Sequence, residues 1–198
     1  MMLIEQTTVP AAALPVEKFK EHLRMGSGFS DDALQDSILE TCLRSAMAAI
    51  EARTGKVLIE REFLWQLTGW RALSEQALPV APVGAVSSLK TLDRLSSATE
   101  IDAARFVLQR DAHRPKLLPT GACLPTIPLG GTAEVVFTAG FGADWNDIPA
   151  DLAQAVMLVA AQFYEHRGDM RARGDTLPVG VNSLIAPYRT VRILGGAA

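Results

Sequence analysis

The sequence predicts an α+β fold with a helical core, an inserted small β-rich lobe and an extended C-terminal tail. Apolar residues recur at helical spacing over residues 30–54 and again over residues 149–167, and between these stretches apolar and polar residues alternate. With 198 residues, 48% of them hydrophobic, the chain is long enough to bury a core without disulfides. We expect one domain over residues 1–198, made of a helical part (14–56), a β-rich lobe (57–140), a long helix (148–168) and a C-terminal tail (176–198).

Two helices are expected before the lobe. Residues 16–24 have apolar side chains at positions i and i+4, which predicts a short N-terminal helix. Ser30 can cap the next helix with its hydroxyl, and the two aspartates that follow lie at the positive end of the helix dipole. This helix ends where Gly55 can adopt the left-handed conformation. Apolar residues cover well over half of its circumference, so we expect it to be packed on two sides.

The lobe is predicted from a change of period. Phe63, Trp65 and Leu67 alternate with mostly polar residues, which indicates a strand that is largely covered. Residues 78–84 contain two prolines and favour an extended link, because proline cannot donate to the middle of a sheet. Further strands are expected over residues 86–92, 106–110 and 134–139, with turns at residues 111–115 and 130–131.

The third helix is predicted to be apolar almost all round. Pro149 fits its first turn, and only a thin polar seam interrupts the apolar side chains up to residue 167. Such a helix is central to its own domain or shared with a neighbouring subunit. Residues 167–175 are typical of a charged loop. The tail over residues 181–194 is too apolar to be solvated and too short to have a core of its own.

Composition argues against several classes of protein. The net charge of −3 disfavours a nucleic-acid binder or a membrane-surface protein, because both need a basic face. Cys42 and Cys123 lie far apart and predict neither a disulfide framework nor a zinc site. Residues 1–15 lack the basic start of a signal peptide, and the most apolar stretch, residues 155–161, is too short to span a membrane. We therefore expect a soluble protein that is synthesised in a reducing cytoplasm.

Motifs for catalysis, cofactor binding or metal binding are not found in the sequence. Gly140 and Gly142 follow a predicted strand but lack the third glycine of a dinucleotide fingerprint. The three histidines are scattered over different predicted elements, and Asp144 and Asp147 are expected to cap a turn or helix rather than to bind calcium. We therefore expect no enzyme activity, no cofactor and no metal. The alternative is a small cytoplasmic enzyme or small-molecule-binding protein of unknown type.

Seven segments resemble, in chain order, the motifs of a known family. They are LPVEKFKEHLR (14–24), DDAL (31–34), AIEARTG (49–55), VVFTAGFG (135–142), IPADL (148–152), QFYEHR (162–167) and LIAPYR (184–189). The set is similar to the head–tail connector (adaptor) proteins of tailed phages, a family that includes the adaptors of phage-derived gene transfer agents. Residues 74–130 match this family only loosely.

The resemblance implies a structural protein at the head–tail interface of a virion. It implies a ring of copies, a dodecamer in the particle, that docks beneath the portal protein and extends the DNA channel. The ring would receive a stopper or tail-completion protein, and DNA would pass without sequence-specific binding. An apolar tail suits a segment that inserts into a partner, and small residues allow helices of neighbouring copies to approach closely. We therefore assign portal docking to Leu184, Ile185, Pro187, Tyr188 and Arg189, and subunit contacts to Ala46, Ala49, Ala153 and Ala160.

Overall fold

The computed structural model describes residues 1–25, 33–166, 177–178 and 180–189. The predicted cap at Ser30, the charged loop over residues 167–175 and the tail from residue 190 onward lie outside these ranges. The chain divides into two compact units. A β unit comprises Met1–Val9 and Ile59–Ala143, and a helical unit comprises Pro10–Leu58 and Asp144–Ala198. The structure is therefore a mixed α+β fold, as the sequence predicts.

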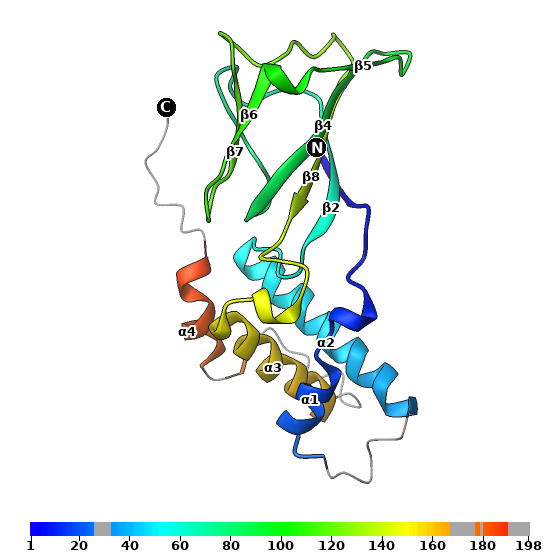
Figure 1. Ribbon diagram of the computed structural model, residues 1–198, viewed down its shortest axis with the longest axis vertical. Coiled ribbons are helices and arrows are strands. Elements are labelled where there is room, and N and C mark those ends of the chain that lie inside the picture. The colour runs from blue at the N-terminus through cyan, green and yellow to red at the C-terminus, as the bar shows by residue number, and fades with distance from the viewer. Residues whose placement is uncertain (26–32, 167–176, 179, 190–198) are drawn as a thin grey trace. The chain divides into compact units, whose positions relative to one another are not determined.

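The described part of the helical unit contains the helices that the sequence predicts (Figure 1). The α-helices are α1 (Val16–His22), α2 (Ala33–Thr54), α3 (Ala150–Glu165) and α4 (Val181–Ile185), and the 3₁₀ helices are η1 (Ala11–Ala13), η4 (Trp145–Asp147) and η5 (Ala186–Tyr188). The end of α2 also follows the prediction. Gly55 has a φ of 68°, and its N–H donates to the carbonyl oxygen of Glu51 at 2.8 Å.

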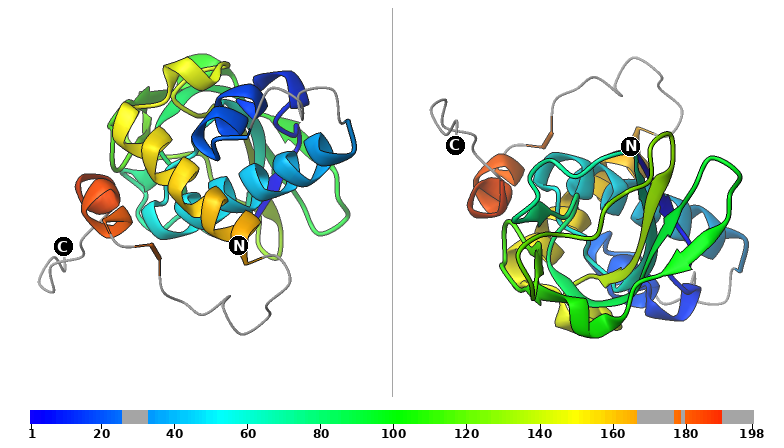
Figure 2. Two further views of the ribbon diagram at one scale, coloured as in Figure 1. Left: turned by 90° about the horizontal axis from the view of Figure 1, so that it is seen from below. Right: turned by 90° about the horizontal axis from the view of Figure 1, so that it is seen from above.

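The core of the helical unit lies along α2 and α3, which pack against each other (Figure 2). Fully buried side chains on these helices include Leu39, Leu43, Ala46 and Ile50 of α2 and Leu152, Val156, Val159 and Ala160 of α3. Helix α1 contributes the buried Phe19 and Lys20. The Lys20 ammonium pairs with Asp36 of α2 at 2.7 Å and with Glu17 at 2.9 Å. Bonding to Asp36, and then to Glu17, raises the pKa of Lys20, so this cation holds α1 on α2.

The described part of the β unit contains two antiparallel sheets (Figure 1). The five-stranded sheet has the order β1-β2-β8-β4-β5, and the three-stranded sheet has the order β3-β7-β6. The strands of the larger sheet are β1 (Met2–Glu5), β2 (Arg61–Leu67), β4 (Val83–Leu92), β5 (Ala98–Glu100) and β8 (Thr132–Ala139). The smaller sheet contains β3 (Gln76–Ala77), β6 (Phe106–Gln109) and β7 (Lys116–Pro119), and η3 (Ala103–Arg105) precedes β6.

Alternating residues of β2 and β8 build the buried face of the larger sheet. Pairing places Phe63 opposite Phe137 and Trp65 opposite Val135. The two phenyl rings stack with their centroids 5.8 Å apart. Phe63, Trp65 and Leu67 are all buried, as the alternation in the sequence predicts.

Several parts of the fold differ from the prediction. The expectation of an extended tail is wrong for residues 181–188, which form α4 and η5. Val181 and Ile185 stand four residues apart, so a helical turn buries both, and Pro187 fits the start of η5. Strands β1, β3, β5 and β7 have no counterpart among the predicted strands. The sequence of β1, MLIE, shows no alternation. Pairing with β2 makes it a strand.

Candidate functional site

The C-terminal segment, which we define as residues 180–189, contains all five residues assigned to docking. Its helix α4 packs on α3 (Figure 1). Val181 and Ile185 are fully buried, whereas the exposed residues are Gly180, Asn182, Ser183, Ala186, Pro187 and Arg189. The segment therefore has an inner apolar face that anchors it in the helical unit and an outer face that is open to solvent.

A side-chain hydrogen bond holds the end of this segment. The Tyr188 hydroxyl donates to Oδ1 of Asp151, in the first turn of α3, at 2.8 Å. Burial of the phenol, followed by the hydrogen bond and the negative charge of Asp151, raises the pKa of Tyr188 to about 12. The phenol is therefore neutral at physiological pH and remains a hydrogen-bond donor.

Replacing Tyr188 with Phe is expected to lower the free energy of unfolding by about 1 kcal/mol, because one hydrogen bond is lost while the ring stays packed. The raised pKa makes the wild-type contribution depend on pH. It is complete below the ordinary tyrosine pKa of 10.0 and is lost as the pH rises through about 12. Urea unfolding of both proteins at neutral pH and above pH 10.0 measures this. The difference in the free energy of unfolding between wild type and Tyr188→Phe should be smaller at high pH. A difference that stays constant with pH would contradict the hydrogen bond from Tyr188 to Asp151.

Burial divides the five assigned docking residues into two groups. Ile185 is fully buried, and Tyr188 is half-buried with its hydroxyl bonded to Asp151. Pro187 and Arg189 are exposed, and Leu184 is half-buried. While the segment stays packed on α3, Pro187 and Arg189 offer the most surface to a partner, and the half-buried Leu184 and Tyr188 offer part of theirs. Docking to the portal remains a prediction for all five.

The four alanines assigned to subunit contacts also differ in burial. Ala46 and Ala160 are fully buried, on helices that pack against each other within one chain. Their small side chains therefore serve the internal packing of α2 and α3 and leave no surface for a second copy. Ala49 and Ala153 are half-buried and keep some open surface. Subunit contact at these positions remains a prediction.

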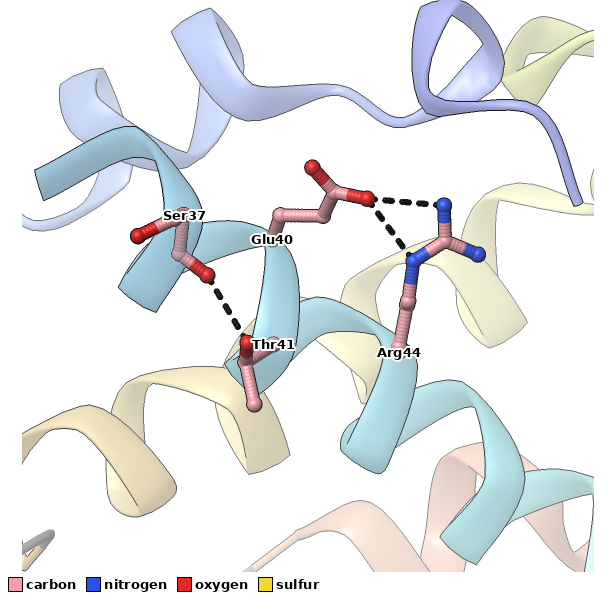
Figure 3. A network of polar contacts seen from close by, with 4 residues as sticks. All are labelled: Ser37, Glu40, Thr41 and Arg44. Atoms are coloured by element: carbon pink, nitrogen blue, oxygen red, sulfur yellow. Dashed lines mark hydrogen bonds and ion pairs between the residues drawn. The ribbon is translucent and has the colours of Figure 1, made fainter. Parts of the chain in front are cut away.

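One face of α2 is exposed along most of the helix. It carries Ile38, Thr41, Ser45, Ala48 and Ala52, spaced three and four residues apart and uncharged. Figure 3 shows the polar contacts at and beside this face: the Thr41 hydroxyl donates to the carbonyl oxygen of Ser37 at 2.8 Å, and the Arg44 guanidinium binds Glu40 at 2.8 and 2.9 Å. The periodicity of the sequence alone does not distinguish this exposed face from the buried face of α2, because the buried face also contains alanine.

Each unit has an open hollow on its surface. The hollow of the helical unit, about 400 Å³, is lined by residues 11–18 and 144–146, and there Lys18 Nζ donates to Asn146 Oδ1 at 2.7 Å. The hollow of the β unit, about 410 Å³, is lined by residues 82–84, 110–112 and 140–141. Histidine, cysteine, serine and threonine are missing from both linings, so neither hollow pairs a hydroxyl or thiol nucleophile with a histidine base.

The acidic residues after β8 have a structural role. The Asp144 N–H donates to Oδ2 of Asp147 at 3.0 Å across η4, which confirms the predicted capping. Within the described residues, no group of three or more His, Cys, Asp or Glu side chains is placed to hold a metal ion. Over the same part of the chain, none of the helices combines the length and the apolar character needed to cross a bilayer.

Solved structures match nearly the whole chain, although no protein-family model and no curated protein does. A chain in a structure described as "Neck of empty GTA particle computed with C6 symmetry" is 50% identical, with a TM-score of 0.89. Chains in "Virion of native gene transfer agent (GTA) particle" and "Neck of native GTA particle computed with C12 symmetry" are 50% and 48% identical, with TM-scores of 0.87 and 0.84. Each match covers 99% of this chain and 99% of the other.

Proposed function

This chain belongs to the head–tail connector (adaptor) family of tailed phages and gene transfer agents, and we propose that it joins head to tail in a gene transfer agent particle. It is a structural component of the particle neck. The observation that carries the assignment is an identity of 48–50% over 99% of the chain with chains from gene transfer agent necks and virions. The described residues offer no observation in favour of the alternative, a small enzyme.

Copies of the chain form an oligomeric ring within the neck. The support is the symmetry of two of the matching neck structures, C6 and C12. In the finer form of the proposal, a dodecameric ring sits beneath the portal protein, extends the DNA channel and receives a stopper or tail-completion protein. A mildly acidic chain suits a channel that DNA must slide through, because tight phosphate contacts would retard the DNA.

The C-terminal segment is the part of the chain that we propose for portal docking. Ile185 and Tyr188 hold the segment on the helical unit, and Leu184, Pro187 and Arg189 then face the portal. Of the four alanines assigned to subunit contacts, Ala49 and Ala153 keep open surface, and we propose these two for the contacts between copies.

Reversing the charge of Arg189 tests the docking assignment. Arg189→Glu is expected to weaken co-sedimentation with purified portal rings about tenfold, which corresponds to ~1.4 kcal/mol. Its side chain is exposed, so the fold should not change. Arg53→Glu on α2 is the matched control, because Arg53 is also exposed and lies outside the segment. Equal binding of the two variants would show that Arg189 is not part of the docking surface.

A further inference from the structure

The outer edge of the five-stranded sheet is formed by β1 and is unusually apolar. Met1, Met2, Leu3 and Ile4 are 87%, 51%, 38% and 36% exposed, and they are four of the nine large hydrophobic side chains exposed among the described residues. Natural proteins normally protect such an edge with lysine, proline or a covering segment. This edge carries no lysine or proline, and its first charged side chain is Glu5, which Arg61 binds at 2.9 Å.

The backbone of β1 is ready to accept another strand. The Gln6 N–H donates to the carbonyl oxygen of Glu62 at 2.8 Å, which fixes the phase of the β1–β2 ladder. Because bonding alternates along an antiparallel strand, Met2 and Ile4 bond to β2. Leu3 and Glu5 therefore direct their N–H and C=O groups away from the sheet. No described strand lies on that side.

The opposite edge of the same sheet is formed by β5, which also directs backbone groups away from the sheet. All three residues of β5 are exposed. The Ile101 N–H donates to the carbonyl oxygen of Leu89 at 2.9 Å. Because bonding alternates along the strand, the backbone of Thr99 bonds to β4, whereas Ala98 and Glu100 direct their N–H and C=O groups away from the sheet. Each edge thus presents two residues with outward backbone groups. Just before β5, Asp93 holds a turn by accepting from the N–H groups of Leu95 and Ser97, and Leu95 is 88% exposed there.

The two edges fit each other in direction as well. Four antiparallel pairings separate β1 from β5, so the two strands run the same way. A twelvefold rotation turns neighbouring copies by only a twelfth of a circle, which keeps their strands roughly parallel. In that arrangement Met1 and Met2 of one copy start beside the turn that exposes Leu95 of the next, so apolar side chains meet apolar side chains.

We propose that β1 of one copy pairs in parallel with β5 of the next copy and joins their sheets around the ring. A closed ring needs two different patches on each subunit, and the two edges of one sheet supply such a pair. The occupant is therefore a second copy of this chain. The proposal rests on the proposed function, because ring assembly in the neck is what brings the two edges together.

Cross-linking in assembled particles tests the pairing. Leu3→Cys combined with Thr99→Cys, in a Cys123→Ser background that removes the exposed native thiol, should give a ladder of linked copies with a short bis-maleimide. Leu3 bonds to the residues on both sides of Thr99 in the proposed parallel pairing, so the side chains of Leu3 and Thr99 lie on the same face of the joined sheet. Either cysteine alone should give none, because the contact joins two different edges. If the chain is present in the particles and the double variant gives no ladder, the strand pairing is wrong and the neck role stands. If the chain is absent from purified particles, the neck role fails and the pairing fails with it.

A proline variant tests the backbone contribution separately. Leu3→Pro removes an outward N–H and keeps the bonds to β2, whereas Leu3→Ala keeps the N–H and shortens the side chain. Loss of one hydrogen bond between each pair of copies should lower the yield of assembled necks about tenfold for Leu3→Pro. The loss for Leu3→Ala should be clearly smaller. Equal yields for the two variants would overturn pairing through the β1 backbone.

Discussion

Ending the chain after Gly180 is expected to abolish the joining of heads to tails. The truncation removes the C-terminal segment apart from Gly180, including the exposed Pro187 and Arg189 that we assign to the portal. It also uncovers the surface buried by Val181 and Ile185, so the free energy of unfolding should fall by about 2–4 kcal/mol. Particles from cells that express only this variant should be DNA-filled heads without tails, and gene transfer should fall to the level of a strain that lacks the chain.

A second truncation is the matched control for the first. Ending the chain after Arg189 keeps every described contact of the C-terminal segment, including the bond from Tyr188 to Asp151. This variant should keep its stability, bind portal rings and support tailed particles. If the variant that ends after Arg189 loses portal binding to the same extent as the variant that ends after Gly180, then the residues after Arg189 make the docking contact. In that case our assignment is wrong. Co-sedimentation with portal rings, combined with electron microscopy of the particles, distinguishes the outcomes.

Replacing Gly140 with Ala is expected to cause a large loss of stability. Gly140 follows β8 with a φ of 145°, a conformation that L side chains rarely adopt. A Cβ there would lie 2.3 Å from Cα and 2.4 Å from N of Glu60. These neighbours are backbone atoms held in place, because the Glu60 N–H donates to the carbonyl oxygen of Gly142 at 2.7 Å. The free energy of unfolding should therefore fall by more than about 4 kcal/mol.

Gly121→Ala is the control for this substitution. A Cβ at Gly121 would meet nothing within 4 Å, so its stability should change by less than about 1 kcal/mol. Urea unfolding followed by circular dichroism measures both variants. Equal midpoints for the two would contradict the close backbone approach at Gly140.

The elements that could be predicted from the sequence are those with local signals. Gly55 ends α2 through its own conformational freedom, Pro149 precedes α3, and the alternation of Phe63 and Trp65 places β2. Each of these signals comes from residues that lie close together in the sequence. It therefore predicts the element without knowledge of the tertiary structure.

The remaining elements depend on contacts between distant parts of the chain. Strand β1 exists because β2 lies beside it, and α4 exists because its two buried residues find a place in the helical unit. Burial of small residues is equally non-local: Ala46 is buried and Ala48 is exposed on the same helix. The assignment of the docking residues rests on resemblance, and the sequence alone does not separate the anchoring Ile185 from the exposed Arg189.

Locating this chain inside the particle tests the central claim most directly. Particles would be purified from cells in which the chain is the only copy and carries an affinity tag, and their necks would be reconstructed by electron cryo-microscopy. Our account predicts density for this chain as a symmetric ring between the portal vertex and the tail, and tailless heads from cells that lack it. Complete, gene-transferring particles whose necks contain no copy of this chain would contradict it.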